Sequence, residues 1–454
     1  MKVVAPPGFC KYHCRIMSNA PRRRYPLSTL SGLGLVGLTL AAALPVWPWH
    51  AAMAGVIFAA SYAALAAGRI PGLAIDRAGI ALVGACLMIA SGALDLRQAY
   101  QALDLDTLTL LLGVMIVTAN LRLSGLFNGL ARALEPRIRA PLTLLAGIML
   151  VAGLASAFLV NDTLCLVMAP LVADLAKRLQ RRPLPYLLAL AMAANIGSVA
   201  TLTGNPQNML IGSASRIPYS AFAAALAPVA LLGLLAAGLV IVLGHRRDFT
   251  AAAAPAPAAA PRPPLRQNRA LALRALAAAL AMVALFFAGV APAKAAILTG
   301  GLLLLTRRLK SHRVYREIDW SLLLMFAGLF ILTAGAERAL LTPALLARVQ
   351  GLGLERALPL TLVTALLSTL VSNVPAILLL KPFLAPLADA RHAWLVAAMA
   401  STLAGNAILP GSVANLIVAQ AAGRAGIRIG FWEHARIGLP VTVLTLAIGV
   451  FWLA

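Results

Sequence analysis

Residues 141–182 decide the fold, and they read PLTLLAGIMLVAGLASAFLVNDTLCLVMAPLVADLAKRLQRR. Two apolar arms flank the polar triplet Asn161-Asp162-Thr163. Arginines at 132–139 precede the first arm, and a basic cluster at 177–182 follows the second. Because Lys and Arg collect in cytoplasmic loops, both ends of the stretch are expected inside. The charges therefore predict a re-entrant hairpin of two half-length arms with a polar tip, which protein or a water-filled cavity must surround.

The rest of the chain is as apolar as these arms. Of its 454 residues 61% are hydrophobic and 11% are charged, whereas soluble domains carry about 25% charged residues. Apolar runs of roughly 20 residues, long enough to cross a bilayer, recur from Leu30 to the C-terminus. The runs are continuous, and a β-barrel would show short alternating segments instead. The predicted fold class is an all-α polytopic membrane protein.

The net charge of +24 does not indicate a nucleic-acid partner. The Lys and Arg residues lie between the apolar runs, where they set topology, and the sequence shows no DNA- or RNA-binding motif. The four cysteines imply neither a disulfide framework nor a metal site. We expect a lipid bilayer as the surroundings, in a bacterial inner (plasma) membrane.

Counting spans from a basic, cytoplasmic N-terminus predicts about eleven crossings and two hairpins. The N-terminal tail is 1–29, the N-terminal half is 30–244, an Ala/Pro-rich cytoplasmic linker is 245–274, and the C-terminal half is 275–454. The predicted hairpins are 141–176 and 358–388, and the predicted crossings are 30–48, 50–68, 78–94, 107–120, 185–213, 222–244, 275–290, 294–306, 320–334, 393–420 and 437–454. Two crossings are interrupted, at Gly204-Asn205-Pro206 and at Pro410-Gly411-Ser412.

The two halves contain an internal repeat. An offset of 215 residues carries Tyr100 onto Tyr315 and Asp104 onto Asp319; an offset of 212 carries Asn161 onto Asn373 and Pro170 onto Pro382; and an offset of 207 carries Gly204 onto Gly411 and Asn208 onto Asn415. The charge count places the two copies in opposite orientations. Inverted repeats with paired discontinuous helices are typical of secondary transporters, whose site lies near the bilayer midplane between the repeats.

Three motifs carry a family resemblance: Phe158-Leu-Val-Asn-Asp-Thr163, Asn195-Ile-Gly-Ser-Val-Ala-Thr-Leu-Thr-Gly-Asn-Pro-Gln-Asn208 and Ser372-Asn-Val-Pro375. With them the chain resembles the ion transporter superfamily, which contains arsenite efflux permeases, citrate transporters and divalent anion–sodium symporters. The likeness extends from about residue 50 to near the C-terminus. It implies an elevator mechanism, a scaffold domain that often forms a homodimer, and a site between the hairpin tips and the unwound helices.

In that superfamily the hairpin tips carry Ser-Asn-Thr or Asn-Asp signatures that bind the coupling cation and the substrate. The resemblance carries these roles to Asn161, Asp162 and Thr163 in the first tip and to Ser372 and Asn373 in the second. The second tip reads Ser-Asn-Val, so its third hydroxyl is missing, which weakens a dicarboxylate–sodium interpretation. The acid in the first tip is nearer to the arsenite-permease branch.

Asp162 is the acid placed most clearly at membrane depth. A carboxylate there costs about 2.5–3.5 kcal/mol, so its presence needs a reason. It either binds a cation or proton, or it caps the helix that follows the tip.

Asn side chains offer oxygens to a cation and N–H groups to an oxyanion, and glycines let the backbone unwind close to a ligand. The alternative for each single Asn or Gly is helix packing. The candidate substrate- and ion-binding residues are Asn161, Asp162, Thr163, Thr203, Gly204, Asn205, Asn208, Ser372, Asn373, Gly411, Ser412 and Asn415. All six histidines fall in tails, loops or span ends, which argues against a histidine proton relay.

The sequence predicts a secondary active transporter for a small anion or oxyanion, arsenite-like or carboxylate-like, coupled to protons or sodium. A passive anion channel and a sodium/proton antiporter on the same fold are the alternatives. No catalytic cluster is present at membrane depth, so no enzyme, no cofactor and no metal beyond a coupling sodium are expected. The chain lacks a phosphate-binding Gly-Lys-Ser/Thr loop, which leaves ATP coupling only to a partner ATPase.

Overall fold

The computed structural model describes residues 50–68, 73–136, 140–250, 268–305, 309–342 and 351–454, together with Leu345, Arg348 and Val349. The predicted tail at 1–29, the first predicted span at 30–48 and linker residues 251–267 lie outside the described residues. Within the described part every regular element is a helix. The all-helical fold class is therefore confirmed.

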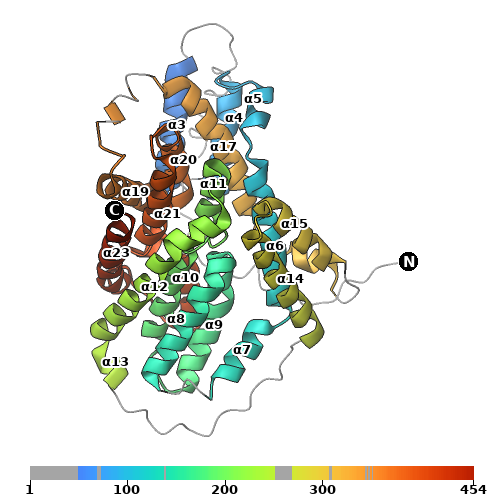
Figure 1. Ribbon diagram of the computed structural model, residues 1–454, viewed down its shortest axis with the longest axis vertical. Coiled ribbons are helices and arrows are strands. Elements are labelled where there is room, and N and C mark those ends of the chain that lie inside the picture. Colours follow the sequence, from blue (N-terminus) through green and yellow to red (C-terminus); the bar gives the residue numbers. More distant parts are fainter. Residues whose placement is uncertain are drawn as a thin grey trace, which may run out of the picture.

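The described helices follow the order of the predicted spans (Figure 1). In the N-terminal half they are α3 (His50–Ala67), α4 (Arg77–Ala90), α5 (Leu96–Ala102), α6 (Leu105–Leu123), α7 (Leu126–Leu134), α8 (Pro141–Phe158), α9 (Asn161–Arg178), α10 (Pro183–Ser198), α11 (Pro206–Ser215) and α12 (Tyr219–Gly244). From the linker onward they are α13 (Arg246–Thr250), α14 (Arg269–Phe287), α15 (Pro292–Leu304), α16 (Ser311–Tyr315), α17 (Trp320–Leu340), α19 (Ala357–Val371), α20 (Asn373–Leu384), α21 (Ala390–Ala404), the 3-10 turn η1 (Leu409–Gly411), α22 (Val413–Arg424) and α23 (Phe431–Leu453).

Several of the few acidic residues begin helices. The carboxylates that accept a hydrogen bond from a first-turn amide belong to Asp76, Asp95, Asp104, Asp319 and Asp389. An aspartate at this position satisfies an orphan N–H group and complements the helix dipole. Proline occupies the first helical position of α8, α10, α11 and α15, where its missing N–H costs nothing. N-cap aspartates and first-turn prolines, which are local signals, thus set where these helices begin.

Six described helices are long and apolar enough to cross a membrane by themselves: α6, α8, α12, α14, α17 and α23. Shorter apolar helices include α4, α10, α15, α19 and α20. These helices fall on predicted apolar runs within the described residues, and the chain is an integral membrane protein by this pattern. The count of eleven crossings and the re-entry of the two hairpins stay predictions.

Four features differ from the sequence prediction. The linker expected at 245–274 is helical at 246–250 and again from Arg269. The arms of the first hairpin are not half-length, because α8 and α9 each have 18 residues, or about 27 Å at 1.5 Å per residue. The interruptions begin earlier than expected, directly after Ser198 and after Ala404. Short helices α5, α7 and α16 occupy segments expected to be loops.

The two halves interlock through matched glycines. Gly113 of α6 lies so close to Ala296 of α15 that a side chain would overlap the carbonyl group of Ala296. Gly328 of α17 lies in the same way against Ala81 of α4, where an added Cβ would be 2.7 Å from the carbonyl carbon. An offset of 215 relates Gly113 to Gly328 and Ala81 to Ala296. Each half therefore packs its own helix on the other half's counterpart (Figure 1).

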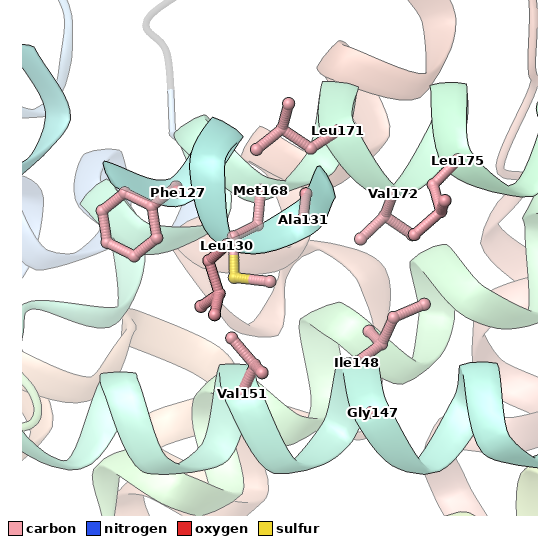
Figure 2. Close-up of a pocket in the computed structure, with 10 residues that line it drawn as sticks. All are labelled: Phe127, Leu130, Ala131, Gly147, Ile148, Val151, Met168, Leu171, Val172 and Leu175. Atoms are coloured by element: carbon pink, nitrogen blue, oxygen red, sulfur yellow. The ribbon is translucent and has the colours of Figure 1, made fainter. Parts of the chain in front are cut away.

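The predicted hairpins lie along the broken spans. Helices α8 and α9 both pack on α10, and α19 and α20 both pack on α21, while α22 packs on α9. The short helix α7 closes an apolar cavity of about 40 Å³ against α8 and α9 (Figure 2). Its lining, from Phe127 to Leu175, offers no side-chain nitrogen or oxygen. This cavity is a packing space and has nothing to hold an anion.

The glycine contacts yield a stability prediction. Gly113→Ala and Gly328→Ala should each lower the thermal unfolding temperature of the detergent-solubilised protein, since overpacking costs about 1–3 kcal/mol. Gly301→Ala is the matched control, because Gly301 in α15 has nothing within 4 Å of an added Cβ. Thermal unfolding followed by size-exclusion chromatography measures the effect. Unfolding temperatures equal to that of Gly301→Ala would contradict the interlocked packing.

Candidate functional site

The first broken span is closed by its own asparagines. After α10 ends at Ser198, the chain is not α-helical until α11 begins at Pro206. Asn205 caps α11, because its Oδ1 accepts a hydrogen bond of 2.9 Å from the amide of Asn208. Asn208 Nδ2 in turn donates to the carbonyls of Ser198 (3.1 Å) and Thr201 (2.9 Å). The carbonyls freed by the unwinding are thus satisfied inside the protein.

The second broken span repeats this arrangement 207 residues later. Ser412 caps α22 by accepting from the amide of Ala414 at 3.2 Å. Asn415 Nδ2 donates to the carbonyls of Gly405 (2.8 Å) and Ile408 (3.3 Å). The glycines that precede the two caps match as well. A side chain at Gly204 would overlap the backbone of Ser198, and one at Gly411 would press on the carbonyl oxygen of Gly405 at 2.9 Å.

The two broken spans are hydrogen-bonded crosswise. Asn205 Nδ2 donates to Thr402 Oγ1 at 3.2 Å, and Ser412 Oγ donates to Asn195 Oδ1 at 3.0 Å. The offset of 207 relates Asn205 to Ser412 and Asn195 to Thr402. The cap of each second half-helix therefore binds the first half-helix of the other broken span. Gln207 Nε2 adds a bond of 3.1 Å to Thr402 Oγ1.

Asn195 is the centre of this cluster. Its Oδ1 accepts from Asn161 Nδ2 (3.1 Å) as well as from Ser412. Its Nδ2 donates to Asn406 Oδ1 (2.9 Å) and to Asn415 Oδ1 (3.1 Å). A side-chain amide has two donors and room for two accepted bonds, so Asn195 uses its full capacity while only 1% exposed. This one side chain joins both broken spans to the tip of the first hairpin.

The first hairpin tip contacts the cluster through Asn161. Its backbone amide donates to the carbonyl of Gly204 at 3.2 Å, and its side chain is buried. Asp162 is partly exposed, and Thr163 makes no side-chain hydrogen bond within the described residues. Helix α9 has Val160 at its N-cap and no side-chain cap. Asp162 therefore forms no side-chain cap in this structure, although it lies in the first turn of α9.

The second hairpin tip lies against a different helix. Asn373 Oδ1 accepts from Ser368 Oγ at 2.7 Å, and the same hydroxyl lies 2.8 Å from the carbonyl of Ser401 in α21. Ser372 has a left-handed φ of 79° that a residue with a side chain rarely adopts, and its hydroxyl makes no hydrogen bond in the described part of the chain. Ser368 thus links Asn373 to α21, and no hydrogen bond in the described part of the chain joins Asn373 to Asn195.

Several residues of the cluster were not among the site residues predicted from the sequence. Asn195, Thr402, Asn406 and Gln207 are polar side chains within apolar helices or at their ends, which is the signal that would have found them. His434 corrects the expectation for the histidines. It is 1% exposed on α23, and its Nε2 lies 3.0 Å from the carbonyl oxygen of Asn406 and 3.5 Å from Asn415 Nδ2.

The sequence prediction placed His434 outside the last span, which it started at 437, whereas α23 begins at Phe431 and includes His434. One turn later, Gly438 brings α23 so close to the break that a side chain would overlap the carbonyl of Asn406. Thr203, the remaining predicted residue, bonds outside the cluster, to the hydroxyl of Tyr219 at 2.9 Å.

Two buried polar atoms of the site do not use their hydrogen-bonding capacity. Within the described residues, Asn208 Oδ1 and Asn406 Nδ2 have no hydrogen-bond partner. Buried polar groups are nearly always paired, so an unused acceptor and an unused donor within one cluster call for an explanation. No group of three His, Cys, Asp or Glu side chains in the described part could hold a metal ion. One acceptor and one donor of the cluster are therefore open to a further partner.

Known proteins resemble the chain over most of its length. The family model described as citrate transporter matches residues 56–404. A silicon efflux transporter of Oryza sativa subsp. japonica is 30% identical, over 84% of this chain and 93% of that protein. An uncharacterized transporter of Mycobacterium tuberculosis is 29% identical over 88% and 97%, and the putative transporter arsB of Dictyostelium discoideum is 22% identical over 83% and 87%.

A solved structure shares the fold. The YdaH transporter of Alcanivorax borkumensis superposes with a TM-score of 0.54 at 15% sequence identity, covering 76% of this chain and 84% of that one. The likeness at this identity concerns the fold. Because the family model covers most of the sequence and an aligned relative shares 30% identity, the chain is a membrane transporter that belongs to the citrate transporter family.

Proposed function

We propose that this protein is a secondary active transporter that moves a small anion or oxyanion by an elevator-type movement, driven by a proton or sodium gradient. The observation that carries the proposal is the buried cluster around Asn195, in which two broken spans and a hairpin tip meet. Discontinuous helices at the junction of two repeats are where secondary transporters bind their solutes.

The charges around the cluster favour an anion together with a cation. Helices α11 and α22 both begin there, and helix N-termini carry partial positive charge that favours an anion. Asp162 lies in the first turn of α9, directly after Asn161 of the cluster, and its negative charge would repel that anion. A proton or sodium ion on Asp162 removes the repulsion, which makes binding of the solute depend on binding of the cation.

The packing divides the helices into two groups that suit an elevator. Hydrogen bonds bind α9, α10, α11, α21 and α22 to one another through the Asn195 cluster. The glycine contacts pair α6 with α15 and α4 with α17, and the packing of α6 on α17 joins the two pairs into a second group. In the proposal the first group carries the solute across, and the second is the scaffold, which also forms the homodimer interface.

The names of relatives indicate the class of solute. One is called a silicon efflux transporter, another is called putative transporter arsB, and the family model is called citrate transporter. Silicate, arsenite and citrate are all hydroxyl-bearing oxygen acids. We take such acids as the substrate class, in a bacterial inner membrane with the N-terminus in the cytoplasm.

Reconstitution into liposomes tests the function. Citrate, arsenite and silicate should be supplied one at a time, under a pH gradient or a sodium gradient imposed separately. A transporter should show saturable uptake of at least one solute that responds to one of the two gradients. Flux that rises linearly with concentration and ignores both gradients would instead identify a passive channel and contradict the proposal.

Asp162→Asn tests the coupling role. The variant should lose gradient-driven flux yet insert and fold normally, since it removes a charge at membrane depth. Asp174→Asn is the matched control, because Asp174 lies on the same helix and pairs only with Arg178 on an exposed face. Flux and its pH and sodium dependence are the measurements. Wild-type behaviour of Asp162→Asn would remove this residue from the coupling mechanism.

Asn195→Ala tests the cluster. The substitution leaves polar atoms of Asn161, Ser412, Asn406 and Asn415 without a partner, at about 1–3 kcal/mol for each buried group. We expect loss of flux and a clear fall in unfolding temperature. Asn120→Ala is the control, since Asn120 is also fully buried but bonds only to the carbonyl of Ile116 on its own helix. A variant that still transports at the wild-type rate would show that the site lies elsewhere.

A further inference from the structure

A second polar cavity lies apart from the Asn195 cluster. It has a volume of about 470 Å³ and is enclosed by α6, α11, α12, α14 and α15. None of the twelve candidate residues lines it. Its lining includes the start of α6, the turn at 216–218 between α11 and α12, and the turn at 289–291 between α14 and α15. The charge-derived topology places all three segments on the outer side of the membrane.

Two cations face this cavity. Arg216 and Lys294 both line it and are both exposed, and within the described residues neither forms an ion pair. One acid, Asp106, also lines it and is likewise unpaired. The neighbouring Asp104 is occupied, since it accepts from Ser213 at 2.9 Å and from Thr107 at 2.7 Å. The cavity therefore offers two positive groups and one acceptor.

The backbone adds to the positive potential. The first turns of α12 and α15 form part of the lining, and neither helix has a side-chain cap or an acidic residue in its first turn. Their free N–H groups and dipoles supplement the two side-chain cations. A ligand with negative oxygens can thus be held by side chains from α11 and α15 at once, while Asp106 accepts a hydrogen bond from a hydroxyl group.

We propose that this cavity is a second binding site, on the outer face, for a small anion that carries a hydroxyl group. Arg216 and Lys294 bind its carboxylate or oxyanion group, and Asp106 accepts from its hydroxyl.

The cavity adjoins the first broken span. Leu202 and Met209 form part of its wall, and Tyr219 lines it while bonding to Thr203. An anion held here lies next to the unwound segment on the outer side. The inference rests on the proposed function only in identifying this anion with the transported solute.

Protection of a cysteine tests the site directly. Ser220→Cys places a thiol in the exposed lining of the cavity, in a background from which the four native cysteines have been removed. A membrane-impermeant maleimide added from outside should alkylate it, and saturating citrate should slow the reaction. Arg216→Gln and Lys294→Gln should each raise the half-protecting citrate concentration about tenfold, the factor that corresponds to one charged hydrogen bond.

Three controls make the result specific. Arg274→Gln, which removes a cation from the other end of α14, should leave protection unchanged. Gln101→Cys, in the predicted outer loop but outside the cavity, should react at one rate with or without citrate. Tricarballylate, which is citrate without its hydroxyl group, should protect less well than citrate, and Asp106→Ala, which removes the acceptor oxygens, should abolish that difference.

Two results would overturn the inference: no protection of Ser220→Cys by citrate, phosphate or sulfate, or equal protection after Arg216→Gln and Lys294→Gln. Flux measured on the same preparation separates this inference from the proposed function. Transport without protection contradicts the outer site alone, whereas protection without any transport contradicts the proposed function alone.

Discussion

The crosswise hydrogen bonds between the two broken spans are the constraint on which the rest of the site depends. An unwound segment inside a membrane exposes carbonyl and N–H groups that lipid cannot satisfy. Here the asparagines of each break satisfy its own carbonyls, and the caps reach across to the other break. Neither broken span could keep this geometry if the other were absent or displaced.

The same network explains why the site has so many amides and so few charges. An amide side chain can donate and accept at once, so Asn195 links four partners without the desolvation cost of an ion. The charged side chain is Asp162, which lies on the tip of the first predicted hairpin, at the edge of the amide cluster. In the proposed mechanism, a cation or proton on Asp162 changes the net charge of the site, while the hydrogen-bonded framework of neutral amides stays the same.

The positions of the helices could be predicted from sequence, because an apolar run of sufficient length is a local signal. The repeat could also be predicted, and Asn208 and Asn415 indeed make equivalent hydrogen bonds. The hydrogen-bond partners of Asn195 and His434 could not, since they lie far along the chain and only the fold brings them together. The outer cavity was missed for a similar reason, because one of its cations follows α11 and the other lies on α15.

The interlocked glycine faces have a consequence for how the protein is made. Helix α6 needs α15 as its partner, and α4 needs α17, so the first half cannot complete its packing when it leaves the ribosome. Residues 124–291 are synthesised between α6 and α15, which takes roughly ten to thirty seconds at the usual rate of about 5–20 residues per second. During that interval the glycine faces of α4 and α6 contact lipid or the insertion machinery. During its synthesis this transporter therefore passes through an intermediate in which the closely packing faces of α4 and α6 have not yet met their partner helices.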